Sequence, residues 1–170
     1  MNKELDEFGK VRYPDAIKLP CPRCGRSAAL SIGQMNFRGK LRWHESAHCN
    51  KCGLRSEADG VGFPPSNIRQ LLIDSDGEWC VIMKDVKSTA SVVKVLQAAL
   101  SLDMKAAIAL LRTEKSVIFR GTKSESLWLI ELIEAAGEAP IMSMFESRTR
   151  EPGASPSFVH DLNLGHFDQQ

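Results

Sequence analysis

Apolar and polar side chains alternate in two stretches of the segment 29–48. Leu30 and Ile32 alternate with small or polar residues, and Leu41 and Trp43 repeat the pattern further along. Alternation with a period of two is typical of a β-strand that buries one face. The segment therefore predicts a β-hairpin.

A different pattern begins at Trp79, where short apolar runs are separated by stretches with helical spacing. Apolar residues recur at intervals of three and four in the segments 89–100 and 101–112, which predicts two consecutive helices. Thr122 and Glu125 have the spacing of a capping box and predict the start of a third helix. Apolar strands are expected at 79–84, 116–119 and 139–145. The order strand, helix, helix, strand, helix, strand places the chain in the α+β class.

Turn-forming residues and composition divide the chain into segments. Pro64 and Pro65, with glycines nearby, mark a boundary before a short helix expected over Ile68–Ile73. The predicted segments are a loosely held N-terminal arm (1–20), a cysteine segment (21–57), a linker with the short helix (58–78), the α+β domain (79–145) and a C-terminal tail (146–170). The tail is rich in Pro, Gly and Ser, yet it holds apolar residues such as Phe158 and Leu162. We therefore expect it to dock on the body of the protein or on a partner.

The composition is that of an ordinary soluble protein, with 170 residues, a formal net charge of +1 and 43% hydrophobic residues. No apolar run reaches the roughly 18 residues needed to cross a membrane. The N-terminus is polar and lacks the apolar centre of a signal peptide. A cytoplasmic location is expected, and in that reducing compartment the five cysteines favour metal binding over disulfides.

Two Cys-x-x-Cys pairs carry the strongest chemical signal, Cys21 with Cys24 and Cys49 with Cys52. Four thiolates complete a closed tetrahedral site of the kind that holds structural zinc. The two pairs, each followed by a glycine, resemble the facing loops of a zinc ribbon, and this resemblance implies one Zn2+ bound by all four sulfurs. A redox-active pair is the weaker alternative, because such a pair acts alone in a thioredoxin-like setting. The zinc would supply folding energy that so short a segment cannot obtain from a core.

Three further residues compete for a role in or near the metal site. His44 and His48 lie close to Cys49 in sequence, but with four cysteines available they are expected to be bystanders. Cys80 lies in a predicted strand and is expected to be a core side chain.

Basic residues are concentrated in the cysteine segment. They are Arg23, Arg26, Arg38, Lys40, Arg42, Lys51 and Arg55, against Glu45 as the acid. Arg38, Lys40 and Arg42 alternate along the predicted hairpin and are expected to share one face, flanked by Phe37 and Trp43. Such a face suits single-stranded nucleic acid, whose bases stack on aromatic side chains. The alternative is that the cations balance an anionic metal site.

The segment 79–144 resembles the C-terminal domain of the bacterial large-subunit ribosomal stalk protein. The matching stretches, in order, are VIMK, VVKVLQAALSLDMKAAIALL, RGTKSES and LIEAAGEAPIM. The resemblance implies a small β-α-α-β-α-β domain whose helix pair binds partners through lysine and aliphatic side chains. Lys94 and Lys105 match family lysines, and Val93 matches an aliphatic contact.

Other parts of the family pattern are missing from this chain. Basic positions of the family fall here on Thr89, Gln97 and Ile108, and a cysteine segment stands where the family has its dimerisation helices and hinge. We therefore expect the fold to be reused beside a zinc ribbon rather than a ribosomal stalk protein. A fold shared in this way does not determine the function.

The sequence lacks a phosphate-binding glycine loop and a convincing pairing of nucleophile and base. The expected function is that of a non-catalytic zinc-binding protein with a macromolecular partner, in particular an immunity or inhibitor protein that masks a toxin or an enzyme. The alternatives are a translation-associated or nucleic-acid-binding accessory protein and a peptide-binding adaptor. The residues expected to contact the partner are Arg38, Lys40, Arg42, Trp43, Lys94 and Lys105.

Overall fold

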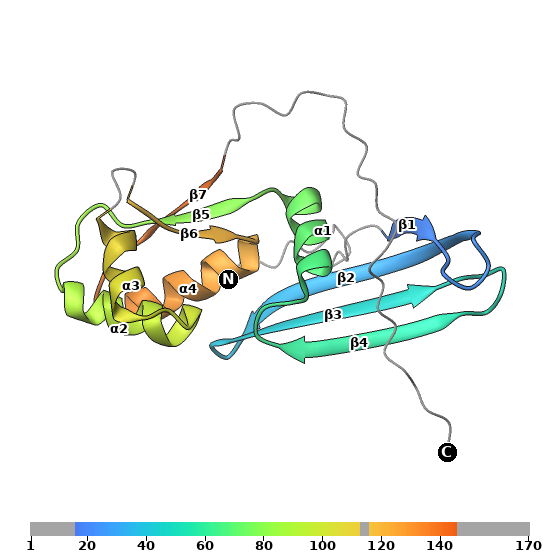
Figure 1. Cartoon of the computed structure of the whole chain (residues 1–170), viewed down its shortest axis with the longest axis horizontal. Coiled ribbons are helices and arrows are strands. Elements are labelled where there is room, and N and C mark those ends of the chain that lie inside the picture. Colours follow the sequence, from blue (N-terminus) through green and yellow to red (C-terminus); the bar gives the residue numbers. More distant parts are fainter. Residues whose placement is uncertain (1–15, 113–115, 146–170) are drawn as a thin grey trace, which may run out of the picture.

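The computed structural model describes residues 16–112 and 116–145, which form two antiparallel sheets and four helices within these ranges. Figure 1 shows the two sheets placed one after the other along the long axis of the molecule, with the helices beside the three-stranded sheet and at the junction. The predicted α+β class is confirmed.

The first sheet is a meander of four strands in the order β1-β2-β3-β4. The strands are β1 (Ile17–Pro20), β2 (Ser27–Phe37), β3 (Lys40–His48) and β4 (Arg55–Val61). The predicted hairpin is the pair β2–β3, which is joined by the two residues Arg38 and Gly39. Both have a positive φ, of 53° and 74° respectively, as two-residue hairpin turns require. Arg38 therefore lies in the turn. The alternation of charges had predicted it on one strand with Lys40 and Arg42, and this prediction was wrong.

This sheet extends beyond both ends predicted for the cysteine segment. β1 lies in the expected N-terminal arm, where Ile17 pairs with Leu30 and Pro20 with Ser27. β4 continues into the expected linker and ends at Val61. The sequence signal was weak at both places because β1 has only four residues and β4 exposes most of its side chains.

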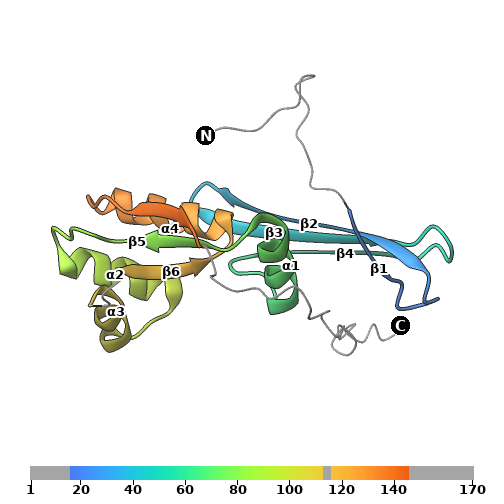
Figure 2. The same cartoon turned by 90° about the horizontal axis from the view of Figure 1, so that it is seen from above.

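The second sheet has the order β6-β5-β7 and belongs to the C-terminal part of the chain. Its strands are β5 (Trp79–Ile82), β6 (Val117–Gly121) and β7 (Ile141–Met144). α2 (Thr89–Leu100), α3 (Met104–Leu111) and α4 (Lys123–Ala135) lie on one side of it, and Figure 2 looks onto the other side. The core between sheet and helices consists of buried apolar side chains, among them Val81, Val92, Leu96, Ile118 and Leu129.

The helix ends follow the local sequence. The Thr122 hydroxyl accepts a hydrogen bond from the Glu125 backbone N–H, and the Glu125 carboxylate accepts one from the Thr122 N–H, so the predicted capping box is confirmed. α1 (Ser66–Asp76) is longer than the predicted Ile68–Ile73, and its N-cap is Pro65. The helix buries Ile68. The short run of apolar residues in the sequence was too weak a signal to predict this packing.

The two sheets are joined at α4, which contacts both of them. The Glu125 side chain is fully buried and binds Arg69 of α1, with Nη2 to Oε2 at 2.8 Å. Gln34 of β2 donates from its amide to the same carboxylate at 3.3 Å and accepts from the Thr122 hydroxyl. Further along, the Trp128 indole donates to the Gly39 carbonyl at 3.0 Å. These bonds fix the β2–β3 hairpin against α4.

Replacing Arg69 by alanine is expected to destabilise the fold. The change leaves the Glu125 carboxylate buried without its cation, which costs about 3 kcal/mol when allowance is made for the partial exposure of Arg69. Urea unfolding followed by circular dichroism measures the loss. The control Gln70→Ala removes an exposed side chain one position along α1 and should change stability by less than about 0.5 kcal/mol. Equal stability of the two variants would contradict a structural role for the ion pair.

Candidate metal centre

The four paired cysteines lie in two loops of the same conformation at one end of the four-stranded sheet. The first loop connects β1 to β2 and the second connects β3 to β4. In the first, the Gly25 N–H donates to the Cys21 carbonyl at 2.8 Å, and the Cys21 N–H donates to the Arg26 carbonyl at 2.6 Å. In the second, Gly53 and Leu54 make the equivalent bonds with Cys49, both at 2.9 Å.

A glycine follows the second cysteine of each loop for a conformational reason. Gly25 and Gly53 have φ values of 69° and 71°, in the left-handed region that other residues enter at a cost. The positive φ turns the chain back so that the N–H of the glycine reaches the carbonyl of the first cysteine. Both sulfurs of a pair then point to the same side of the loop.

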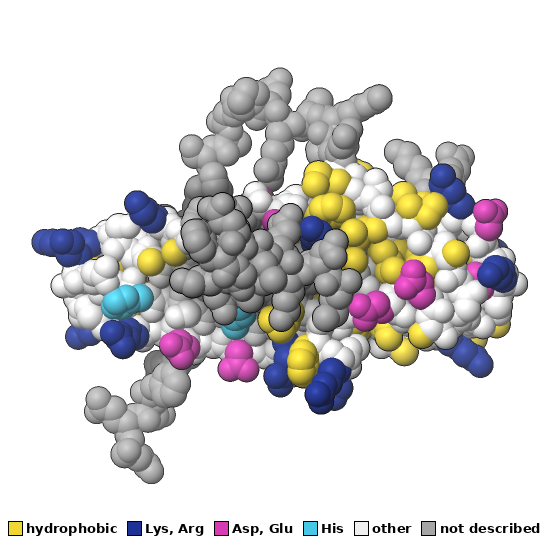
Figure 3. Space-filling view, turned by 180° about the vertical axis from the view of Figure 1, so that it is seen from behind, with side chains coloured by type: hydrophobic (Ala, Val, Ile, Leu, Met, Phe, Trp, Pro, Cys, Tyr) yellow, Lys and Arg dark blue, Asp and Glu magenta, His cyan; other side chains and the backbone are white. Residues whose placement is uncertain are grey.

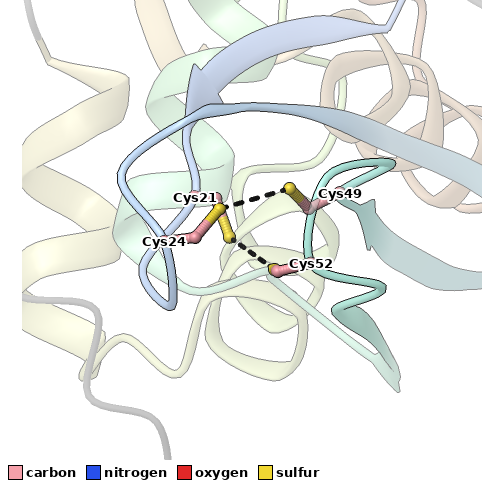
Figure 4. A group of neighbouring side chains, drawn as sticks. All are labelled: Cys21, Cys24, Cys49 and Cys52. Carbon is pink, nitrogen blue, oxygen red and sulfur yellow. Dashed lines mark hydrogen bonds between the residues drawn. The ribbon is translucent and has the colours of Figure 1, made fainter.

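The four sulfur atoms converge between the two loops, as Figure 4 shows. All lie within 4.8 Å of one another. The Sγ atoms of Cys21 and Cys52 are 3.6 Å apart, and those of Cys24 and Cys49 are 3.7 Å apart. Four thiolates at about 2.3 Å from Zn2+ stand about 3.8 Å from one another in a regular tetrahedron. The four cysteines could therefore hold a metal ion, and their spacing fits tetrahedral thiolate coordination.

The acidities of the thiols differ strongly in this arrangement. Backbone N–H groups of Cys52 and Lys51 stabilise the Cys49 thiolate and lower its pKa to about 6. The Arg26 N–H acts in the same direction on Cys24, but desolvation and the neighbouring thiols outweigh it and raise the pKa of Cys24 to about 11. One sulfur is thus prepared as a ligand near neutral pH, while another must lose a proton when a cation binds.

The other residues considered near the metal site lie outside the sulfur cluster. Within the described residues, the group able to hold a metal ion consists of the four cysteines and includes neither histidine. His44 pairs with Gly33 across the sheet, and its imidazole occupies the space above that glycine. Cys80 is buried in β5, where its thiol donates to the Ser143 carbonyl at 3.3 Å.

The expected partner-binding residues are divided among separate places. Lys40 and Arg42 lie on one face of the hairpin, opposite Phe37 and Met35 in the β-sheet register. Trp43 was expected beside them but lies on the opposite face, because successive side chains of a strand alternate, and its ring lies over Gly60 of β4. Its prediction as part of the same surface was wrong.

The face of the hairpin that carries Lys40 and Arg42 also exposes apolar side chains. We call this face and the adjoining turn the tip surface. It consists of Met35, Phe37, Arg38, Lys40, Arg42 and Val61. Sequence analysis missed Met35 and Val61, because their exposure depends on the register of three strands.

The last two predicted contact residues lie on the helices of the second sheet. Lys94 is on α2 and Lys105 is on α3, and both are exposed. They belong to a different part of the molecule from the tip surface, which borders α4.

Comparisons with known proteins provide no relative. No family model matches the chain, and no curated protein or solved structure matches it either. Among the described residues, no helix has the length and apolar character needed to span a membrane.

The chain is expected to bind one zinc ion per molecule, and serine at Cys24 or Cys52 should abolish stoichiometric binding. A site with three thiolates loses both affinity and the folding energy that the metal supplies. Elemental analysis of purified protein measures the metal content. Cys80→Ser is the control, because Cys80 lies outside the cluster and its variant should retain zinc. A zinc content that is unchanged in Cys24→Ser would refute the assignment of this ligand.

Zinc affinity is expected to fall as the pH falls. The Cys24 thiol is protonated below its pKa of about 11, so binding releases its proton and the apparent affinity should drop at least about tenfold per pH unit. Below the Cys49 pKa of about 6 a further proton competes with the metal at this sulfur, and the dependence should become steeper. Competition with a chromophoric chelator between pH 5 and 8 provides the test, and an affinity that is independent of pH would contradict it.

Proposed function

We propose that this chain is a non-catalytic zinc-binding protein that binds an acidic macromolecular partner through the tip surface. In this proposal the metal is Zn2+, the first sheet with its two cysteine loops is a zinc ribbon, and the zinc has a structural role. The observation that carries the proposal is the combination of exposed apolar and basic side chains on the tip surface.

The tip surface exposes large apolar side chains that the fold does not need to leave in water. Met35 is 53% exposed, Phe37 is 50% exposed and Val61 is 62% exposed. Through the register of β2, β3 and β4, Arg42 lies between Met35 and Val61. A group of apolar side chains gathered on one face favours an interaction surface, whereas single exposed apolar residues do not.

The charge of the tip surface is independent of the metal centre. β2 begins beside the first cysteine loop and runs for 11 residues to Phe37, which corresponds to about 36 Å at the usual rise per residue. Arg38 lies at about this distance from the cysteine loops, whereas Arg42, which precedes Cys49 by seven residues, lies about 23 Å from them. Charges at these separations are screened in physiological salt, where the Debye length is about 8 Å. Arg38, Lys40 and Arg42 therefore do not serve to balance the thiolates, a role that Arg23 and Lys51 beside the cysteines can fill.

The apolar content of the tip surface favours a protein partner over a nucleic acid. Interfaces with DNA are more polar than interfaces between proteins, whereas the buried centre of a protein interface is enriched in aromatic residues, Met and Arg. Here two of the three large apolar side chains, Met35 and Val61, are aliphatic and offer no face for base stacking. An acidic surface on a toxin or another enzyme would meet both the cations and the apolar residues, which supports an immunity or inhibitor role.

The C-terminal part would present the ribbon and contribute a second contact. Its elements follow in the order β5, α2, α3, β6, α4, β7, and we propose that they form a domain like that of the ribosomal stalk protein. Lys94 and Lys105 are exposed on the α2–α3 pair, where the family binds its partners. A peptide adaptor would instead need an exposed apolar or acidic pocket on this domain.

Replacing both Lys40 and Arg42 by glutamate is expected to weaken partner binding by at least about tenfold, since the variant opposes an acidic surface and each lost contact at the centre of an interface costs more than about 1 kcal/mol. The tagged protein is used to capture its partner from host lysate treated with nuclease, and the partner is then purified for titration. The matched control is Lys84→Glu with Arg112→Glu, which makes the same charge change at exposed residues outside the tip surface and the cysteine loops.

The outcomes separate the candidate functions. A stoichiometric protein that binds wild type and the control but not the tip variant supports the proposal. Equal binding by both variants would exclude the tip surface as the contact. Capture of nucleic acid that is lost with nuclease, with affinity for a single-stranded oligonucleotide that falls steeply with salt, would replace the proposal by the nucleic-acid-binding function.

A further inference from the structure

Within the described part of the chain, the outer edge of β7 is an unprotected strand edge. β7 lies at one side of the sheet β6-β5-β7, and within residues 16–112 and 116–145 no strand pairs with its outer side. Its sequence, Ile-Met-Ser-Met, carries no charge and no proline. Ile141 is 43% exposed and Met144 is 52% exposed.

The other edge strands of the described chain carry features that discourage pairing. β1 contains Lys18 and Pro20, and β4 contains Arg55, Glu57 and Asp59. β6 carries Arg120, and the register of its pairing with β5 shifts near Val81. Charges, proline and bulges are the usual means by which proteins prevent edge-to-edge association. β7 has none of them within its length.

The hydrogen-bonding groups of β7 that point outward can be identified from its pairing with β5. The Phe145 N–H donates to the Glu78 carbonyl at 2.7 Å, and bonded positions alternate along an antiparallel strand. Ser143 and Ile141 therefore also bond toward β5. The backbone groups of Met142 and Met144 point away from the sheet. The Met144 carbonyl accepts a hydrogen bond from the Ser143 hydroxyl at 3.3 Å and has a second lone pair for the N–H of another strand.

We propose that β7 pairs in antiparallel fashion with β7 of a second copy of this chain and joins the two three-stranded sheets into one. The two-fold axis passes through Ser143, which faces Ser143 of the second copy. Met142 of one copy then exchanges backbone hydrogen bonds with Met144 of the other copy. The two-fold axis generates a second, equivalent pair. The register places Ile141 opposite Phe145 of the second copy on the open face of the sheet.

The side chains in this register are compatible with a two-fold axis. Each apolar residue of the strand meets another apolar residue, and the axis itself brings together two serines, so no like charges face each other. Hydrophobic side chains gather over this part of the molecule in Figure 3. Leu127 of α4, a helix that contacts β7, is 41% exposed and adds to the apolar area near the edge.

A strand of four residues provides a small interface. It buries less than the roughly 800 Å² per partner that is common in stable complexes. The dimer should therefore form at high protein concentration and dissociate on dilution. This inference uses no residue of the tip surface and does not depend on the proposed partner.

Ser143→Cys, made like its controls in a Cys80→Ser background, tests the position of the axis, because Cys80 lies opposite Ser143 on β5 and would otherwise compete for the new thiol. Residues opposite each other without mutual hydrogen bonds have Cα atoms about 4.5 Å apart, a distance that a disulfide can bridge. The full-length variant should form a covalent dimer in oxidised glutathione, as seen on non-reducing gels. The controls are Cys80→Ser alone and Ala139→Cys, whose Cα atoms would stand about 26 Å apart across the axis. A disulfide yield at Ser143→Cys no higher than at Ala139→Cys would overturn the proposal.

Sedimentation velocity over a wide concentration range provides the second measurement. Wild type and Ser143→Thr should both show a concentration-dependent dimer. Ser143→Glu and Ser143→Lys should each lose it, because like charges then meet at the axis, and a mixture of the two should recover it. A wild-type protein that stays monomeric at all concentrations would overturn the proposal. This outcome includes the case in which residues 146–170 cover the edge of β7.

Discussion

The buried carboxylate of Glu125 holds the molecule together at the point where its two parts meet. It lies at the start of α4 and closes the capping box with Thr122, so the helix cannot begin elsewhere without exposing it. It also binds Arg69 of α1 and Gln34 of β2. A buried carboxylate is tolerated only when its oxygens have such partners. One side chain therefore sets the start of α4, the place of α1 and the position of the hairpin.

The hairpin is consequently held at both of its ends by different physical means. At one end the two cysteine loops bring four sulfurs together, and a metal ion there would tie β1–β2 to β3–β4. At the other end the indole of Trp128 binds the carbonyl of Gly39. Metal coordination would thus maintain the strand order of a sheet with few buried side chains, while the hydrogen bond to α4 fixes the position of the turn.

Much of this could be predicted from local sequence, because the signals involved are local. The spacing of Cys21, Cys24, Cys49 and Cys52 predicted the cluster, and the spacing of Thr122 and Glu125 predicted the capping box. The position of Trp43 could not be predicted in the same way, because it depends on which face of the hairpin packs toward α4. The pairing of Arg69 with Glu125 joins residues far apart in sequence, and neither residue has a local pattern that reveals its partner.

The turn at Arg38 and Gly39 fixes the length of the β2–β3 hairpin. This length sets the distance between the cysteine loops and α4. Two additional residues in each of β2 and β3 would lengthen the hairpin by about 7 Å. Insertion of two residues in each strand would keep the faces of the sheet but would move the turn beyond Trp128. Insertion of one residue in each strand would exchange the two faces of the hairpin and turn Met35 and Phe37 toward α4. The exposed side chains of β2 and β3 can therefore vary, whereas the number of residues between the two cysteine pairs is restricted.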